Sequence, residues 1–408
     1  MGTEGRGGMK SSDLRRLALG DIAKISSGGT PSRSVPEYWN GEVPWVKTAQ
    51  IQNCKITSGK IDEWITAAGL KGSSAKMIAA GTVLMAMYGQ GKTRGQVAIL
   101  EIDASINQAC AAIELSEEAN RDYVFQYLLF SYDRIRQMSN TGGQENLSAA
   151  LIKEIPILLP PLPEQKAIAD LLATWDAAIE KTERLIEAKE RRFRGLMQEL
   201  IGDVCHQWKH FRPDAIFDTV SEKNFPEEEL LSVTQDRGVI PRSMLEGRVM
   251  SPDGSTSGYK RIKRGDFAIS LRSFQGGIEY SDYQGILSPA YTVLRPKIAM
   301  SEDYWRLFFK SYIFIKRYLD LAVIGIRDGK QISIPDFMSV KIPVPSVQDQ
   351  CRIAETVSYV QREIGLLKGI LEQYKKQKRG LMQKLLTGEW RVDAKNNESK
   401  ERAKNGKK

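Results

Sequence analysis

A gapless internal repeat is the feature that most limits what this chain can fold into. Residues 160–200 align with residues 345–385 at a constant offset of 185 residues. Both copies end in the identical run Arg-Gly-Leu-Met-Gln, which begins at Arg194 in the first and at Arg379 in the second. Chance is a poor explanation for such a match, so we expect two copies of one structural unit.

Each repeated segment predicts one long helix. A proline-rich stretch precedes each segment and cannot be helical, so the start of the helix is sharp. Apolar residues then recur with alternating spacings of three and four over about five heptads, which is typical of a coiled coil. Lys189 and Lys378 interrupt the apolar stripe, and Gly202 and Gly388 are suitable stop residues. The stripe consists of Ile168, Leu172, Trp175, Ile179 and Ile186 in the first copy and Ile353, Val357, Val360, Ile364, Leu367 and Leu371 in the second.

The natural partner of the first long helix is the second. If a pseudo-two-fold axis relates the copies, as in a symmetric dimer fused into one chain, the two helices pair antiparallel. The plainer alternative is two separate amphipathic helices, each packed on its own domain. The length of the heptad pattern favours pairing.

The globular parts repeat more faintly. Asp122-Tyr123 matches Asp303-Tyr304, and each pair opens an apolar helical segment, 124–135 or 305–319. Each half then ends in a strand flanked by proline, expected over 155–159 and 340–344.

A hairpin is expected in each half. Segments 82–88 and 96–102 are β-rich and flank a glycine-rich turn, which predicts a hairpin in the first half. We expect 267–271 and 290–295 to play the same part in the second half.

These patterns predict an α+β fold. It has two mixed α/β domains separated by a long antiparallel two-helix coiled coil, with an internal pseudo-two-fold repeat. The expected parts are a flexible arm over 1–13, a first domain over 14–160, a first long helix over 161–202, a second domain over 203–345, a second long helix over 346–388 and a disordered basic tail over 389–408.

The net charge of +9 favours an anionic partner, with nucleic acid first. The four cysteines lie far apart and form no CxxC pair, which suits free thiols in a reducing compartment. The N-terminus lacks the apolar core of a secretory signal, and no apolar run has the length of a membrane span. We therefore expect a cytoplasmic protein.

Several motifs, together with the order of module, helix, module and helix, resemble the DNA-specificity subunit of type I restriction–modification systems. They are Gly28-Gly-Thr-Pro31, Val43-Pro-Trp45, the proline-rich helix entries with Glu164-Gln165 or Asp349-Gln350, and the Arg-Gly-Leu-Met-Gln helix ends. The resemblance covers nearly the whole chain, from about Leu14 to about Val392.

The resemblance implies a function without catalysis in this chain. Each globular half would be a target-recognition domain that reads one half of a bipartite double-stranded DNA site. The long helices would set the unread spacer and dock two methyltransferase (modification) subunits, and restriction or translocase subunits can join them. S-adenosylmethionine, ATP and magnesium would be bound by those partners, and no cofactor or metal by this chain.

Candidate DNA contacts are basic and polar residues near the predicted turns, because lysine and arginine bind phosphates and polar side chains contact base edges. They are Thr30, Ser32, Arg33, Lys47, Gln90, Lys92, Thr93 and Arg94 in the first half, and Arg237, Arg242, Lys260, Arg261, Arg272, Ser273 and Gln275 in the second.

Two rival functions stay open at this point. The run Ala86-Met-Tyr-Gly-Gln-Gly-Lys92-Thr93 fits a relaxed phosphate-loop pattern and would suit a nucleotide-dependent DNA-acting enzyme. A true phosphate loop opens a helix, however, whereas the sequence after Lys92 predicts a strand. The other rival is a structural coiled-coil protein. Cys205, His206 and His210 resemble a metal cluster but lack a fourth ligand.

Overall fold

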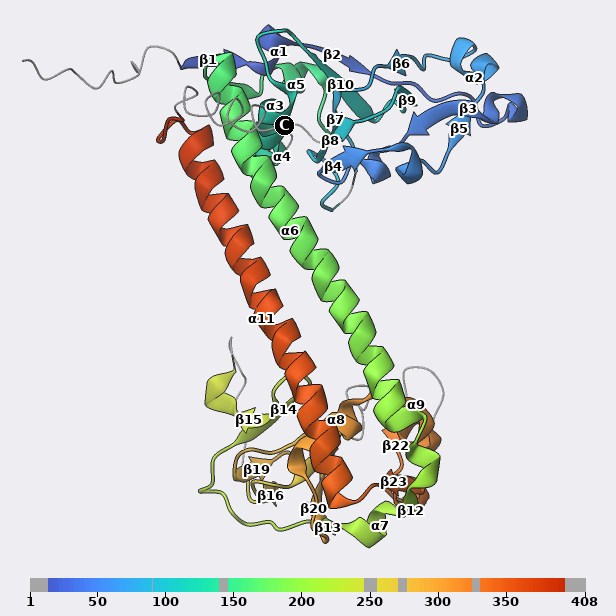
Figure 1. Cartoon of the computed structure of the whole chain (residues 1–408), viewed down its shortest axis with the longest axis vertical. Helices are drawn as coiled ribbons and strands as arrows, with labels where there is room; N and C mark the ends of the chain where they lie inside the picture. Colours follow the sequence, from blue (N-terminus) through green and yellow to red (C-terminus); the bar gives the residue numbers. More distant parts are fainter. Residues whose placement is uncertain are drawn as a thin grey trace, which may run out of the picture. The chain divides into compact units, whose positions relative to one another are not determined.

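The chain divides into two compact units that share its two long helices (Figure 1). Unit 1 consists of Met1–Thr182 and Ile370–Lys408, and unit 2 of Glu183–Gly369. The boundaries between the units lie inside the long helices, after Thr182 and after Gly369. The domain limits that the sequence predicts at the helix ends therefore stay predictions. The computed structural model describes residues 14–89, 91–138, 146–245, 255–270, 277–324 and 331–392.

Unit 1 is built on a five-stranded sheet in the order β2-β10-β7-β8-β4. Strand β7 pairs antiparallel with both β8 and β10, which confirms the predicted hairpin. Alternate residues of β7 enter two different apolar clusters: Val83 packs with helix residues, whereas Leu84 packs with Ile56 of β4. The sheet is therefore buried on both faces. Its strands are β2 (Ala23–Ser27), β4 (Cys54–Ile56), β7 (Val83–Ala86), β8 (Val97–Leu100) and β10 (Cys110–Leu115).

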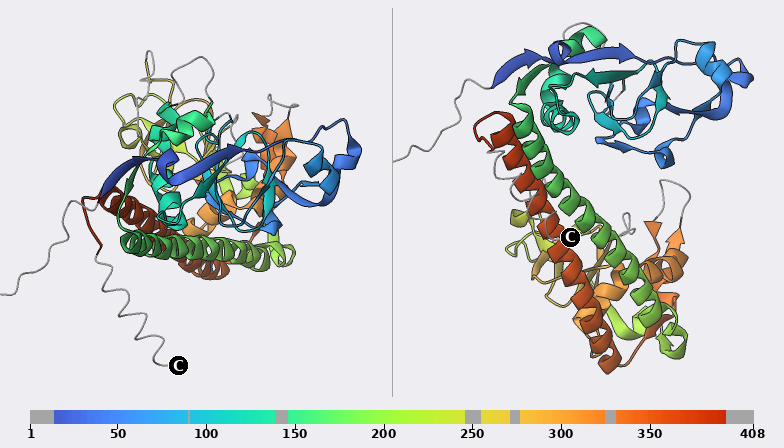
Figure 2. Two further views of the ribbon diagram at one scale, coloured as in Figure 1. Left: turned by 90° about the horizontal axis from the view of Figure 1, so that it is seen from above. Right: turned by 45° about the horizontal axis from the view of Figure 1, so that its top comes forward.

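Helices and a second sheet complete unit 1. Asn120 and Ser148 cap α3 and α5, because each side chain accepts a hydrogen bond from a backbone N–H in the first turn. The second sheet has the order β5-β3-β9-β6, and with α2 it lies away from the start of α6 (Figure 2). The elements are β1 (Arg15–Ala18), α1 (Leu19–Ile22), β3 (Trp39–Val46), β5 (Trp64–Ile65), α2 (Ala67–Lys71), β6 (Met77–Ile78), β9 (Ala104–Ile106), α3 (Arg121–Phe130), α4 (Tyr132–Met138), α5 (Ala149–Lys153) and β11 (Pro156–Leu159).

Unit 2 repeats this plan with a four-stranded sheet in the order β13-β20-β17-β18. Its core is richer in aromatic rings than that of unit 1; the Phe217 ring alone lies within 5.8 Å of the rings of Phe267, Trp305 and Phe309. The pair β12–β23 is the counterpart of β1–β11.

The elements of unit 2 before its last helix are β12 (Lys209–Phe211), α7 (Pro213–Ile216), β13 (Phe217–Val220), β14 (Leu231–Thr234), β15 (Gly238–Pro241), β16 (Lys260–Ile262), β17 (Phe267–Ser270), β18 (Glu279–Tyr280), β19 (Gly285–Leu287), β20 (Tyr291–Pro296), α8 (Glu302–Lys310), α9 (Tyr312–Arg317), β21 (Val323–Ile324), β22 (Gln331–Ile332), α10 (Ile334–Ser339) and β23 (Ile342–Val344).

The hairpin expected in unit 2 is partly wrong. Strand β17 matches the prediction, but its hairpin partner is β18, and β20 on its other side is the counterpart of β10. The segment 290–295 is therefore the strand between β13 and β17, and not the hairpin partner that the sequence predicted. β18 has only two residues and shows no alternating pattern, whereas β20 has six and gives the stronger signal.

The long helices are α6 (Leu162–Met197) and α11 (Val347–Leu386), and each begins directly after a proline-containing entry. Gly388 has a φ of +76°, the left-handed conformation that ends many helices and favours glycine. Gly202 instead closes a π-helical turn, Gln198–Gly202, that follows α6. No helix within the described ranges has the length and apolarity needed to cross a membrane.

The two long helices pack antiparallel within each unit. In unit 1 the ring of Trp175 lies 5.7 Å from that of Tyr374. In unit 2 the ammonium of Lys189 on α6 lies 2.6 Å from the carboxylate of Glu363 on α11. Met197, which comes later than Lys189 on α6, shares an apolar cluster with Ala354, which comes earlier than Glu363 on α11, so the two helices run in opposite directions. The alternative in which each helix packs only on its own domain is therefore wrong.

The predicted stripe lies on the inner side of the helices. Its ends also join the unit cores, since Ile168 and Leu172 pack in the core of unit 1 and Ile353 and Val357 in that of unit 2. Ile168, Leu172, Ile186, Ile353, Val357, Ile364 and Leu371 are buried, and Trp175, Ile179, Val360 and Leu367 are half-buried.

A buried glutamine fixes the start of each long helix. The amide of Gln165 donates to the carbonyls of Pro160 and Glu118 at 2.8 and 3.0 Å, and its oxygen accepts from Asn120 N–H at 2.7 Å. In unit 2 the amide of Gln350 donates to Pro345 at 3.0 Å and accepts from Ser301 N–H at 2.8 Å. Asn120 and Ser301 are the N-caps of α3 and α8, so each glutamine joins the long helix to the domain helix.

A polar bridge interrupts the apolar stripe of unit 1. Asp176 on α6 accepts from the Lys378 ammonium at 2.6 Å and from the Gln126 amide at 2.7 Å. The side chain of Lys378 is only 13% exposed. The interruption seen in the sequence at Lys378 is therefore an ion pair that connects α6, α11 and α3.

The segment after α11 folds back onto the start of α6. The carboxylate of Glu164, which is 1% exposed, accepts from the Arg391 guanidinium at 2.6 and 2.8 Å and from Val392 N–H at 3.1 Å. The expectation of a disordered tail over 389–408 is therefore wrong for 389–392. Residues 393–408, like the expected arm over 1–13, lie outside the described ranges.

We expect Gln165→Leu to lower the free energy of unfolding by about 1–3 kcal/mol, because it leaves the buried Pro160 carbonyl and the partly buried Glu118 carbonyl and Asn120 N–H without this partner. Chemical denaturation followed by circular dichroism measures this. Gln383→Leu, at an exposed position on α11, is the matched control and should change little. Equal effects of the two substitutions would contradict the role assigned to Gln165.

Candidate nucleic-acid interface

The turn between β7 and β8 is held in place by α4. The Tyr132 hydroxyl donates to the Lys92 carbonyl at 2.6 Å, and Arg136 donates to the Gly91 carbonyl. Gly91 and Gly95 have φ values of +66° and +84°, which explains the glycines of this turn. Lys92 is exposed and Thr93 half-buried, so this anchored turn presents a lysine to solvent.

Arg94 does not fit the predicted contact. Its side chain is buried, with 3% of the residue exposed, because the turn packs against α4. A buried guanidinium in that position cannot reach a DNA groove without rearrangement.

Arg33 and Lys47 lie together in the outer part of unit 1, around Glu63. The Lys47 ammonium lies 2.6 Å from Glu63 and 3.1 Å from Asp62, and the Arg33 guanidinium 2.5 Å from Glu63. Arg33 also stacks over the Trp39 ring, 3.7 Å from its centroid. The structure thus brings the two predicted cations together but pairs both with acidic side chains.

This pairing shifts the pKa values of the cluster. Burial raises the pKa of Glu63, but hydrogen bonds from Lys47 and Arg33 outweigh burial and hold that pKa below its ordinary value. The hydrogen bond to Glu63 likewise holds the pKa of Lys47 above its ordinary value. Both groups are charged near neutral pH, so a phosphate would have to compete with Glu63 for the cations.

The glycine motif before Arg33 serves packing. A Cβ added to Gly28 would lie 1.9 Å from the Ile106 carbonyl oxygen, so only glycine fits there. The Trp45 indole donates to the Gly29 carbonyl at 3.0 Å. Within the predicted set, Thr30 is half-buried and Ser32 is exposed, with its hydroxyl 2.8 Å from that of Ser34.

In unit 2 the predicted cations of β16 also bind other groups of the protein. Arg261 pairs with Glu228 at 2.6 Å and lies over the Phe225 ring. Lys260 donates to the Tyr291 carbonyl at 2.7 Å, and burial lowers its pKa. Both residues are therefore tied to the fold and are poorer candidates for phosphate contact than their charge suggested.

Arg237 and Arg242 flank the short strand β15. Arg237 is exposed and donates to the Met244 carbonyl at 3.2 Å, whereas Arg242 is half-buried and donates to Ser232 at 3.3 Å. Four further candidates, Gln90, Arg272, Ser273 and Gln275, lie outside the described residues.

The described residues give no support to a phosphate loop at Lys92 or to a metal site at Cys205, His206 and His210. Lys92 is followed by β8, a strand paired with β7, and not by the helix that a phosphate loop needs. Among the described residues no group of three or more His, Cys, Asp and Glu side chains could hold a metal ion. The Sγ of Cys205 is buried and accepts from the Tyr318 hydroxyl at 3.7 Å, so this thiol is part of the packed interior of unit 2.

Reasoning from sequence missed the acidic half of the unit 1 cluster. Backbone pairing between β3 and β5, including Trp45 N–H to the Glu63 carbonyl at 3.0 Å, brings Glu63 beside Lys47. The two-residue strand β5 gives almost no pattern, so the available signal was only the adjacent charges Asp62-Glu63.

Comparison with known proteins agrees with this architecture. The family described as type I restriction modification DNA specificity domain matches residues 12–190 and 209–376. The MjaVIII type I restriction enzyme specificity subunit of Methanocaldococcus jannaschii is 23% identical over 410 residues, covering 93% of each chain. The EcoR124I/EcoR124II specificity subunit of Escherichia coli is 25% identical over 194 residues, covering 45% of this chain and 47% of the relative.

Two solved structures share the fold. The S subunit of a type I restriction–modification system from M. genitalium has a TM-score of 0.54 at 17% identity, covering 91% of this chain and 96% of that one. A chain from a study of assembly and conformational transition of the type I R-M system has a TM-score of 0.57 at 15% identity, covering 92% and 97%. The two family matches span most of the sequence, one in each half, and this chain therefore belongs to the DNA-specificity subunits of type I restriction–modification systems.

Proposed function

We propose that this chain is a non-catalytic subunit in which each unit reads one half of a bipartite double-stranded DNA site. The observation that carries the proposal is a shared scaffold with different outer parts. Both units have the same central strand order, but unit 1 adds the sheet β5-β3-β9-β6 where unit 2 has the hairpin β14–β15 and the pair β16–β19. Two different outer surfaces on one scaffold suit two different half-sites.

The long helices are proposed to set the spacer between the half-sites and to dock two modification subunits. The study of complex assembly that includes a similar chain supports docking. S-adenosylmethionine would be bound by the modification subunits, and ATP and magnesium by a restriction subunit where one is present. The domain limits 14–160 and 203–345 are proposed as the parts that read DNA.

Lys92 is the proposed phosphate contact for which the local structure is clearest, because its turn is anchored while its side chain is exposed. Arg33 and Lys47 are proposed to contact DNA by exchanging Glu63 for a phosphate. Thr30, Ser32 and Arg237 are also proposed to contact DNA, although the local structure supports them less directly than it supports Lys92.

Inserting one heptad into each long helix, after Thr182 and after Gly369, should lengthen the preferred spacer by about three base pairs. Seven residues add about 10 Å of helix, and one base pair adds about 3.4 Å. Binding to duplexes with graded spacers, measured with the modification subunit present, checks this. Unchanged spacer preference would rule out a ruler role for the helices.

Lys92→Ala should weaken binding to all duplexes alike and reduce the slope of log affinity against log salt by about 1, because one phosphate contact is lost. Filter binding at several salt concentrations measures the slope. ATP binding by the unaltered chain that disappears in the same variant would instead support the nucleotide-enzyme alternative.

Glu63→Gln should raise DNA affinity by roughly two- to fivefold, the equivalent of one partly exposed ion pair, because Arg33 no longer has to leave a carboxylate and Lys47 keeps only Asp62 as an acidic partner. Glu101→Gln is the matched control: it makes the same charge change in unit 1, where Glu101 pairs with Lys55 at 3.7 Å. A similar gain in both variants would show that net charge alone is responsible.

A further inference from the structure

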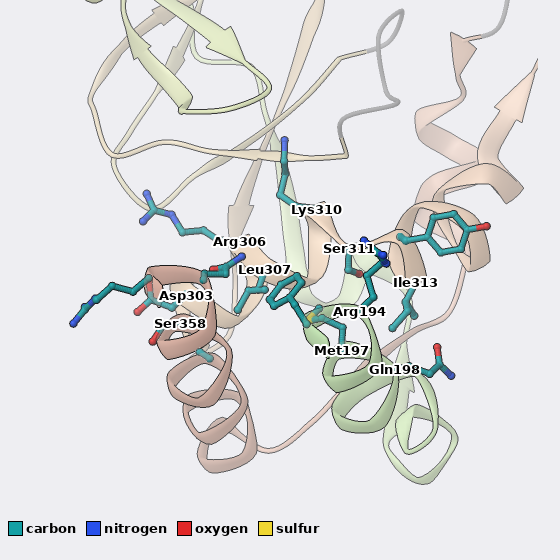
Figure 3. Close-up of a pocket in the computed structure, with 15 residues that line it drawn as sticks. Arg194, Met197, Gln198, Asp303, Arg306, Leu307, Lys310, Ser311, Ile313 and Ser358 are labelled. Atoms are coloured by element: carbon teal, nitrogen blue, oxygen red, sulfur yellow. The ribbon is translucent and has the colours of Figure 1, made fainter. Parts of the chain in front are cut away.

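Unit 2 contains an open groove at its end of the long helices. The groove has a volume of about 820 Å³ and is lined by residues of α6, α8, α9 and α11 (Figure 3). Phe193, Met197, Leu307 and Ile313 give it an apolar lining. Figure 3 shows Leu307 between the ribbon of α11 and Met197 on α6.

The repeat identifies the equivalent positions in unit 1. The offset of 185 relates Phe193 to Lys378, and the offset of 181 that relates Asp122-Tyr123 to Asp303-Tyr304 places Leu307 at the position of Gln126.

Asp176, the acceptor of the polar bridge with Lys378 and Gln126 in unit 1, also has its counterpart in the groove. Asp176 corresponds to Gln361, and Phe193, Leu307 and Gln361 all line the groove of unit 2. In unit 1 the corresponding side chains bind one another, since Asp176 accepts from both Lys378 and Gln126. The same site of the duplicated scaffold is thus closed by its own side chains in unit 1 and left open in unit 2.

The groove carries an excess of positive charge. Four of its lining residues are cationic and one, Asp303, is acidic. Arg306 and Lys310 pair with Asp282 and Glu279 and point toward the strands. Arg194 and Arg362 are exposed and come from α6 and α11, so both long helices contribute positive charge to the groove.

The two ends of this chain outside the described residues do not match that chemistry. Residues 1–13 contain two acidic and two basic side chains, and residues 393–408 contain three acidic and six basic ones. Neither segment combines acidic charge with apolar anchors. A nucleic acid backbone matches the charge but would leave the apolar lining without a partner.

We propose that the groove of unit 2 binds an acidic amphipathic helix of a protein partner. Apolar side chains spaced by three and four residues would fill the space above Leu307 and Phe193, and carboxylates on either side would meet Arg194 and Arg362. Because the counterpart in unit 1 is closed, the partner helix binds once per chain. This inference rests on the proposed docking role of the long helices, for which it names one binding site, and it does not depend on the proposed reading of DNA.

The test uses the full chain and a fluorescein-labelled synthetic helix of about 20 residues, long enough to form a helix when bound, with leucine on one face and glutamate on the other. Fluorescence anisotropy should show saturable binding at one site per chain. A scrambled peptide of the same composition should bind at least about tenfold more weakly. Equal binding of both peptides, or no binding of either, overturns the proposal.

Substitutions that give unit 2 the side chains of unit 1 should close the groove. The triple change Phe193→Lys, Leu307→Gln and Gln361→Asp should weaken peptide binding by about tenfold or more. Unchanged binding in this variant overturns the proposal.

Charge reversal gives a second measurement that leaves the apolar core intact. Arg194→Glu with Arg362→Glu should also weaken binding by about tenfold. Arg191→Glu with Arg192→Glu is the matched control, because it makes the same change of charge: both arginines are exposed on α6 and neither lines the groove. Equal losses in both variants, or displacement of the peptide by a non-cognate DNA duplex, would show a general electrostatic surface and overturn the proposal.

Discussion

The buried glutamine at the entry of each long helix is the contact on which the rest of the structure depends. Gln165 and Gln350 are each 1% exposed, and each amide both donates to a proline carbonyl and accepts from the N-cap of a domain helix. An amide can do both at once without water, so it fixes where the long helix leaves its unit. The sheet and helices around the two glutamines are alike, even though the outer parts of the units differ.

Much of the scaffold could be predicted because its signals are local and repeated. The three-four spacing from Ile168 to Ile186 and from Ile353 to Leu371 predicted the long helices and their pairing. The β-rich runs on either side of the glycine turn predicted β7 and β8. In each case several residues carry one periodic signal, so single exceptions such as Lys378 did not hide it.

The candidate site was less predictable because charge alone does not show whether a cation is available. Arg94 is buried under a turn, Arg261 pairs with Glu228, and Lys47 pairs with Glu63 through the pairing of β3 with β5. These partners are distant in sequence or lie on strands of two or three residues, where no periodicity exists. The same reason explains why β20 was mistaken for a hairpin strand.

The ion pair between Glu164 and Arg391 has a consequence for the order in which the chain is completed. Unit 2 is one continuous stretch, Glu183–Gly369, whereas unit 1 needs both the beginning of the chain and its last helical turns. On the ribosome, where folding follows synthesis from the N-terminus, every residue of unit 2 is made before the C-terminal residues that complete unit 1. The unit that starts first is therefore the last to be finished, and a chain cut short before residue 391 would leave the Glu164 carboxylate buried at the helix entry without its cation.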